Sequence, residues 1–125
     1  MALTKKSFIL AVSLLVMMLH SCTDKEPSIL KVYVRSSDYI LTEGALVRLV
    51  GDISKGTPEF YDEKRSNDAG TVIFNLDELF DSYGKDDEKV AYFNVYAKDT
   101  TNTFTISKAR AKANLTSTHT IVLED

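Results

Sequence analysis

The chain has 125 residues, of which 44% are hydrophobic and 26% are charged, a composition that suits one folded domain. Its 15 basic and 18 acidic residues give a formal charge of −3. This acidic balance argues against nucleic acid as a partner, because phosphate binding needs a basic face. A single cysteine excludes a framework of disulfides within the chain.

Residues 1–21 have the features of a signal peptide that directs a protein out of the cytoplasm. Lys5 and Lys6 form a short positive region, and Phe8–Leu19 follows as an apolar run of 12 residues that only Ser13 interrupts. A membrane-spanning helix needs about 20 apolar residues, so this run is too short to serve as one. We predict that residues 1–21 are removed on export. The loss of Lys5 and Lys6 then leaves a formal charge of −5.

The one cysteine stands directly after the predicted signal peptide. Leu19-His20-Ser21-Cys22 resembles the lipobox of bacterial lipoproteins, in which a small residue precedes a cysteine that becomes diacylated and heads the mature chain. Ordinary cleavage would instead leave Cys22 as a lone thiol, with no second cysteine to pair with it. The resemblance implies a membrane anchor, because two or three acyl chains, at about 0.8 kcal/mol per buried methylene, hold a small domain at a membrane almost permanently.

Residues 22–28 are interpreted as the lipidated cysteine and a short tether, because Thr23–Ser28 is polar and contains a proline. Asp24 and Glu26 resemble the signal that sends some Gram-negative lipoproteins to the cell surface. A solvated linker on the periplasmic face is the alternative. We therefore expect an outer membrane lipoprotein, on the cell surface or on the periplasmic face.

Residues 29–125 form the predicted folded domain, and most of it alternates as short strands do. In Ile29–Arg35, for example, every second side chain is apolar, as in a half-buried strand. Phe104 and Ile106 are the only large apolar residues of a later strand, so they are its expected core anchors. The predicted strands are Ile29–Arg35, Ala45–Gly51, Glu59–Arg65, Thr71–Leu76, Val90–Lys98, Thr103–Ala111 and Ser117–Leu123.

Two local signals flank the strand Thr71–Leu76. Before it, Asn67 and Gly70 suit the first and last positions of a type I turn. After it, the hydrophobic period changes from two to that of a helix, which predicts a helix over residues 77–83. The apolar residues on one face of this helix are Leu76, Leu79, Phe80 and Tyr83.

Seven or eight short strands with one small helix predict an all-β fold, an antiparallel β-sandwich. Within it, three stretches resemble the transthyretin-like, or prealbumin-like, sandwich: Gly44–Leu49, Asn67–Leu76 and Ala91–Ala97. In its carboxypeptidase-regulatory-like members, a Gly-Ala-x-Val strand is followed by an Asp-x-Gly-x-x-x-Phe turn and strand, and then by an aromatic-rich strand. The resemblance covers residues 29–123 and implies a transthyretin-like fold, while it says little about function.

Hydrolytic catalysis has little support in the sequence. After residue 21 the chain has one histidine, His119, and no cysteine besides Cys22, whereas an activated nucleophile needs a positioned base. One enzyme of the resembling fold, 5-hydroxyisourate hydrolase, ends in Tyr-Arg-Gly-Ser and uses several histidines, whereas the last four residues here are Val-Leu-Glu-Asp. We therefore predict no catalytic residues and no cofactor.

Two polar loops raise the questions of metal binding and of modification. Asp86-Asp87-Glu88 could supply oxygen ligands for Ca²⁺ but lacks the fixed spacing and the glycine of a calcium loop. A solvated charged loop is the simpler interpretation, so we predict no metal site. Asp99-Thr100-Thr101 resembles the O-glycosylation site of some Gram-negative envelopes, with Thr100 as the modified residue, and it also suits a hairpin turn. Both interpretations of this loop stay open.

Three tyrosines, Tyr33, Tyr92 and Tyr96, are predicted to point outward from their strands. If they lie on adjacent strands, they form one face that can stack on sugars or contact a partner protein. We therefore predict a candidate binding face for a protein or glycan ligand.

These features favour a non-enzymatic, lipid-anchored envelope protein that acts as a binding or assembly module. A structural, fimbria-like subunit is the alternative, in which Thr103–Ser107 adds as a strand to a neighbour's sheet. An enzyme resembling 5-hydroxyisourate hydrolase is the third hypothesis. The expected partners are the membrane, through the lipidated Cys22, and a protein or glycan ligand.

Overall fold

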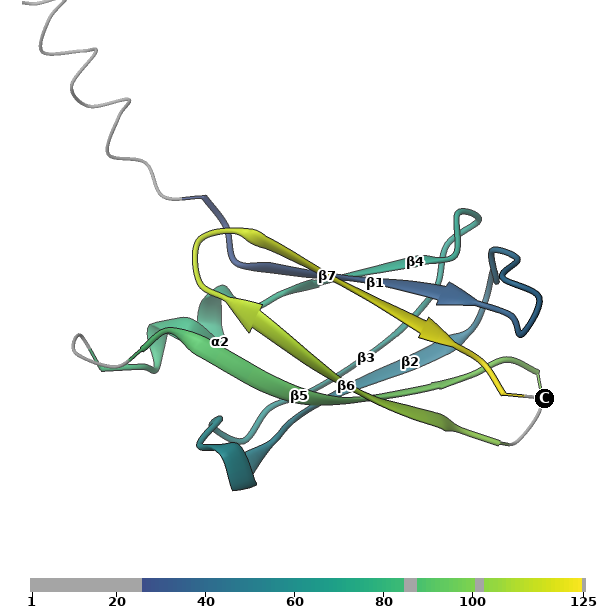
Figure 1. Cartoon of the computed structure of the whole chain (residues 1–125). Coiled ribbons are helices and arrows are strands. Elements are labelled where there is room, and N and C mark those ends of the chain that lie inside the picture. The colour runs from purple at the N-terminus through teal and green to yellow at the C-terminus, as the bar shows by residue number, and fades with distance from the viewer. Residues whose placement is uncertain (1–25, 85–87, 101–102, 125) are drawn as a thin grey trace, which may run out of the picture.

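The computed structural model describes residues 26–84, 88–100 and 103–124, and in them the chain forms seven strands that pack as two sheets (Figure 1). The strands are β1 (Ile29–Arg35), β2 (Leu46–Gly51), β3 (Tyr61–Arg65), β4 (Thr71–Asn75), β5 (Val90–Lys98), β6 (Thr105–Lys112) and β7 (Thr116–Val122). The three-stranded sheet has the order β4-β1-β7, and the four-stranded sheet has the order β3-β2-β5-β6. The predicted all-β sandwich is confirmed.

One strand pair departs from the expected antiparallel arrangement. β1 pairs with β7 in parallel, from Ile29 beside Thr116 to Arg35 beside Val122, whereas the other strand pairs of the described residues are antiparallel. The turn after β6 reverses the chain and carries it from the four-stranded sheet to the three-stranded one. β7 therefore runs opposite to β6 and along β1. Strand alternation does not encode this direction, because it specifies only which face of a strand is buried.

The two sheets bury their apolar faces against each other in one core. In β1, β2 and β5 every second side chain is buried, so these three strands supply much of it. Phe74 of the three-stranded sheet and Phe93 of the four-stranded sheet are the largest fully buried side chains. Burial of such side chains is the main force that stabilises a sandwich of this size.

The inward face of β6 differs from the prediction. Ile106 is 61% exposed and lies on the outer face, whereas Ala109 and Ala111 are buried. Ala109 stands opposite Phe93 of the neighbouring strand, and a large ring beside it leaves room for only a small side chain. The expectation that Phe104 and Ile106 anchor this strand in the core is therefore wrong. The size of a residue alone does not show how much of the core the neighbouring strand has already filled.

The helix α2 (Asp77–Asp81) closes one end of the core with its buried Leu79 and Phe80. It is shorter than the predicted 77–83, because Ser82 already forms its C-cap: the N–H groups of Ser82 and Tyr83 donate to the carbonyls of Leu79 and Phe80, each at 3.1 Å. The helix is also bonded to the residue that leads into β1. The N–H of Ser28 donates to Oδ1 of Asp77 at 2.8 Å, and Ser28 is only 2% exposed.

The predicted turn at Asn67–Gly70 is present. The N–H of Gly70 donates to the carbonyl of Asn67 at 2.9 Å, and the side-chain oxygen of Asn67 accepts from the N–H groups of Ala69 and Thr71. Gly70 has a φ of +66°, and a Cβ there would lie 2.9 Å from the carbonyl oxygen of Val34. Both the dihedral angle and the close approach of the β1 backbone require glycine.

Gly70→Ala therefore destabilises the domain more than Gly44→Ala does. Gly44 also has a positive φ of +73°, but a Cβ there meets no atom within 4 Å. We expect Gly44→Ala to lower the free energy of unfolding by about 1 kcal/mol through the dihedral angle alone. Gly70→Ala adds the clash, for a total of about 2–4 kcal/mol.

Urea unfolding of both variants measures the difference. Equal losses of stability in the two variants would contradict the assigned contact between the turn and the β1 backbone.

Candidate functional site

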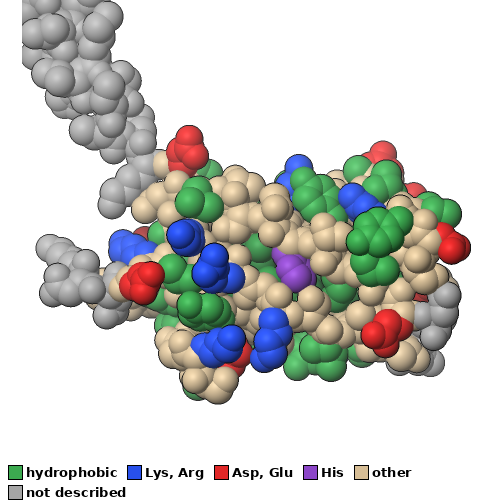
Figure 2. Space-filling view, in the orientation of Figure 1, with side chains coloured by type: hydrophobic (Ala, Val, Ile, Leu, Met, Phe, Trp, Pro, Cys, Tyr) green, Lys and Arg blue, Asp and Glu red, His purple; other side chains and the backbone are tan. Residues whose placement is uncertain are grey.

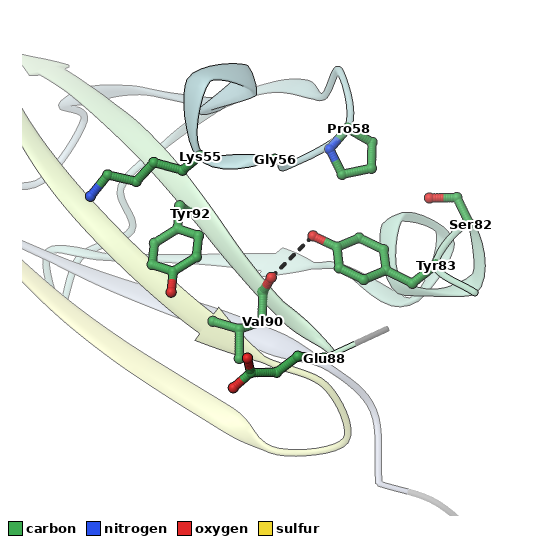
Figure 3. Close-up of a pocket in the computed structure, with 8 residues that line it drawn as sticks. All are labelled: Lys55, Gly56, Pro58, Ser82, Tyr83, Glu88, Val90 and Tyr92. Atoms are coloured by element: carbon green, nitrogen blue, oxygen red, sulfur yellow. Dashed lines mark hydrogen bonds between the residues drawn. The ribbon is translucent and has the colours of Figure 1, made fainter. Parts of the chain in front are cut away.

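A cleft opens on the outer side of the four-stranded sheet, between the 3₁₀ helix η1 (Ile53–Lys55), the residues that follow α2 and the start of β5. Its volume is about 460 Å³, within the range of ligand sites. In Figure 3, Pro58 faces Ser82 and Tyr83 at one side, while Lys55 and Tyr92 lie together at the other. The lining residues are Lys55, Gly56, Pro58, Ser82, Tyr83, Glu88, Val90 and Tyr92.

A second, smaller cavity of about 210 Å³ adjoins the first and reaches β6. Both cavities are lined by Lys55 and Tyr92, so they meet at these two side chains. We call the two cavities together the Tyr92 groove. The residues that line only the second cavity are Asp52, Phe93, Lys108, Ala109 and Arg110.

Backbone hydrogen bonds hold the loop that forms one wall of the groove. The N–H of Asp52 donates to the carbonyl of Tyr92 at 2.8 Å, and the N–H of Tyr92 donates to the hydroxyl of Thr57 at 2.8 Å. The bond from Asp52 continues the β2–β5 ladder beyond the end of β2 at Gly51, and the Thr57 side chain adds a second bond from the loop to β5. The wall is therefore fixed to the strand that carries Tyr92.

Two contacts orient the side chains of the groove. Nζ of Lys55 lies 5.2 Å from the centroid of the Tyr92 ring, a cation–π distance. On the other side, the hydroxyl of Tyr83 donates to the carbonyl of Val90 at 3.2 Å, which ties the residues after α2 to β5 (Figure 3). The groove is thus bordered by side chains that already have partners within the domain.

Asp52 is the acidic side chain of the smaller cavity, and it is kept ionised. The Ser54 hydroxyl donates to its carboxylate at 2.6 Å and holds the pKa of that group below its ordinary value. Nζ of Lys108 lies 3.4 Å from the same carboxylate and acts in the same direction, against the opposing effect of burial. Asp52 therefore neutralises Lys108 within the groove.

The three predicted tyrosines do not form one face. Each is outward and half-buried, but Tyr33 is on β1, whereas Tyr92 and Tyr96 are both on β5. Because β1 and β5 belong to different sheets, their outer faces lie on opposite sides of the sandwich. The single tyrosine face is therefore corrected to a pair on β5 and a separate tyrosine on β1.

Tyr96 belongs to an aromatic and cationic cluster at the other end of β5. Its ring meets that of Phe104 edge-on, with 6.4 Å between centroids. The guanidinium of Arg48 and the ammonium of Lys98 lie 4.8 Å and 4.7 Å from the Phe104 centroid. The sequence analysis assigned Phe104 to the core and so missed it as a surface residue. Only the pairing of β5 with β6 shows that Phe104 lies beside the outward Tyr96.

A hydrogen-bonded triad adjoins that cluster on β2 and β3. Arg48 donates to the Glu63 carboxylate, and the Tyr61 hydroxyl donates to the same oxygen at 2.9 Å. The bond from Arg48 is the main reason that the pKa of Glu63 lies below its ordinary value, with Tyr61 second. Arg48 is thereby held in place over the Phe104 ring.

His119, the one candidate base, lies on β7 and reaches across to β6. Its Nε2 is 2.9 Å from the Ser107 hydroxyl, and burial alone lowers its pKa below the ordinary 6.5. No acidic side chain contributes to that shift, and neither residue lines the Tyr92 groove. The pair connects the two sheets at the edge where β6 and β7 meet.

Several predicted residues lie outside the described part of the chain. These are Cys22, the apolar run of residues 8–19, and Asp86 and Asp87 of the acidic loop. Within the described residues, no group of three or more His, Cys, Asp or Glu side chains is placed to hold a metal ion. The same residues contain no helix of the length and hydrophobicity needed to cross a membrane. Thr100 is described and exposed, in the hairpin loop between β5 and β6.

Comparison with known proteins agrees with the fold and adds no function. No family model matches the chain, and no curated protein sequence does. Among solved structures, the Bacillus anthracis TIE protein is similar, with a TM-score of 0.52 and 11% identity over 78% of this chain. The match spans 16% of the length of that protein. At this identity the likeness supports a β-sandwich alone.

The burial of His119 predicts a pH-dependent stability. The imidazole of His119 takes up a proton at a higher pH in the unfolded chain than in the folded chain. The free energy of unfolding that neutral, half-buried His119 contributes is therefore complete above pH 6.5 and is lost as the pH falls below it. The free energy of unfolding should therefore decrease between about pH 7.5 and 5.5, above the range in which most carboxylates titrate.

His119→Gln keeps an amide that can bond Ser107 but does not titrate, so it should flatten this dependence. Urea unfolding at both pH values, with wild type and variant side by side, measures it. An unchanged slope in the variant would assign the dependence to another group.

Proposed function

We propose that the protein is a non-enzymatic, lipid-anchored envelope protein whose sandwich binds a ligand in the Tyr92 groove. The observation that carries this proposal is the groove itself, a cleft of about 460 Å³ that continues past Lys55 and Tyr92 into a second cavity. Its wall from Asp52 to Thr57 is bonded to β5. A site that is already ordered loses little conformational entropy when a ligand binds, which favours binding.

A transthyretin-like topology is part of this proposal. In the structure, the first of the three stretches that resemble the family forms β2 and the Gly44-Ala45 before it. The second forms the turn and β4, and the third lies in β5. Thus strand, turn with strand, and aromatic-rich strand follow in the order that the resemblance implies. Such a sandwich serves here as a rigid scaffold that presents loops and one sheet face.

Lipid attachment at Cys22 is supported by the lipobox-like residues before it and by the absence of a second cysteine. The domain also holds the chain firmly where it leads into β1. The Ser28 hydroxyl accepts from the N–H of Asn114, its N–H donates to Asp77, and its carbonyl accepts from Leu76. Six residues, Thr23–Ser28, lead from Cys22 to this point and reach about 20 Å at most. The sandwich would therefore stay close to the membrane.

No contact of the described residues favours the fimbria-like alternative. The segment proposed to add to a neighbour's sheet, Thr103–Ser107, makes bonds within its own domain. The hydroxyl of Thr105 accepts from the N–H of Glu124 at 3.0 Å, and Ser107 bonds His119. We therefore advance the binding module alone.

Protease treatment of intact cells tests the proposal through the anchor. We expect the native protein to remain with the membrane fraction and to be digested on whole cells. The Cys22→Ala variant, which has no thiol to acylate, should be lost from the outer membrane, either released or retained inside the cell, while its sandwich stays folded, because Cys22 lies outside the domain.

Antibody detection before and after protease treatment gives the readout, and digestion after the outer membrane is broken is the positive control. Protection until that step would place the domain in the periplasm. A Cys22→Ala variant that reaches the outer membrane as the native protein does would overturn the lipid anchor.

A further inference from the structure

Charge is segregated by secondary structure in this domain. Of the described residues, nine of the eleven Lys and Arg lie in strands, whereas only two of the fourteen Asp and Glu do. The outer face of the four-stranded sheet carries one carboxylate, Glu63, and six basic side chains. Figure 2 shows Lys and Arg gathered on the side where β6 ends. The six are Arg48, Arg65, Lys98, Lys108, Arg110 and Lys112.

The basic side chains converge on the Tyr92 groove. Arg110 stands directly opposite Tyr92 in the strand register, and Lys112 stands opposite Val90. Lys55 approaches Tyr92 from η1. Lys108 is paired with Asp52, but among the described residues no carboxylate pairs with Lys55, Arg110 or Lys112. The residues that line the groove include Lys55, Lys108 and Arg110 against Asp52 and Glu88, so the groove keeps an excess of one positive charge, although the whole chain is acidic.

We propose that the Tyr92 groove binds an anionic polysaccharide, with Lys55 and Arg110 pairing carboxylate groups and the Tyr92 ring stacking on a sugar. This inference rests on the proposed function and names its ligand class. Three observations carry it: the positive excess, the aromatic ring between the cations, and the two cavities that continue into each other on either side of that ring. An extended chain with a charge on successive units matches a groove of this form.

A flat membrane surface and a nucleic acid fit the observations less well. A bilayer surface is flat and has no protruding part that could enter the cavities on both sides of Tyr92. A nucleic acid is disfavoured by the acidic balance of the whole chain, because binding a run of phosphates needs a broad basic surface. Both occupants are outcomes of the test below.

The test titrates polygalacturonate into the full-length protein, purified in detergent, with calorimetric detection. Neutral dextran, vesicles that contain phosphatidylglycerol and single-stranded oligothymidine are the comparison ligands. We expect binding of polygalacturonate, no binding of dextran, and a loss of affinity of about tenfold in Lys55→Ala/Arg110→Ala, since each exposed pair contributes modestly.

The other sheet offers a matched control in Lys31→Ala/Arg35→Ala. It removes the same charge from beside another outward tyrosine, because Lys31 and Arg35 lie 5.3 Å and 5.2 Å from the Tyr33 ring. We expect this variant to bind polygalacturonate as the wild type does. Thermal melting of both variants verifies that they are folded.

Four results would overturn the inference: no binding of polygalacturonate, equal loss of affinity in both variants, vesicle binding that falls in Lys55→Ala/Arg110→Ala as polygalacturonate binding does, or preference for the oligonucleotide. Equal loss of affinity in both variants would assign binding to overall charge. The vesicle result would assign it to a membrane surface, and preference for the oligonucleotide would assign it to nucleic acid. The proposed function is tested separately, because protease treatment of cells locates the protein whatever these titrations show. If the protein is exposed on the cell surface but does not bind polygalacturonate, the proposed ligand class is wrong and the proposed lipid anchor stands.

Discussion

Neither sheet of this sandwich is stable alone, because each buries its apolar side chains only against the other. Phe74 and Phe93, one from each sheet, occupy the core completely enough that β6 presents only alanine opposite Phe93. Pairing of β4 with β1 in one sheet brings the Asn67–Gly70 turn against the backbone of β1, where only glycine fits. Core volume thus determines the inward face of an edge strand, and strand pairing determines the turn.

The groove follows from this packing. With the inner faces filled by aliphatic and aromatic residues, Tyr92 and the basic side chains of β6 are left on the outside of the four-stranded sheet. Asp52 and Thr57 fasten the loop with η1 to β5 through bonds that extend the sheet, so the wall of the groove is as well held as the sheet itself. A site built in this way depends on scaffold stability, because local opening of the loop would break sheet hydrogen bonds.

Much of the fold could be predicted from the residues in order. Five of the strands both begin and end within one residue of their predicted bounds, and the helix begins at the predicted Asp77. The errors have one physical origin. Phe104 and Ile106 were assigned inward on account of their size, but the register with β5 places Ile106 opposite the outward Tyr96. The common tyrosine face failed in the same way, since an outward Tyr33 and an outward Tyr92 are indistinguishable until the sheets are known.

The sequence by itself determined where the chain turns at Asn67–Gly70, which side chains point to water in most strands, though not in β6, and that the domain is an all-β sandwich, because these depend on neighbours within a few residues. The tertiary structure alone decided the parallel pairing of β1 with β7, the joining of Lys55 to Tyr92, and the collection of basic residues on one face. Net charge gave no indication of that face. Composition sums over the whole surface, whereas electrostatic recognition depends on which charges the strand pairing brings together.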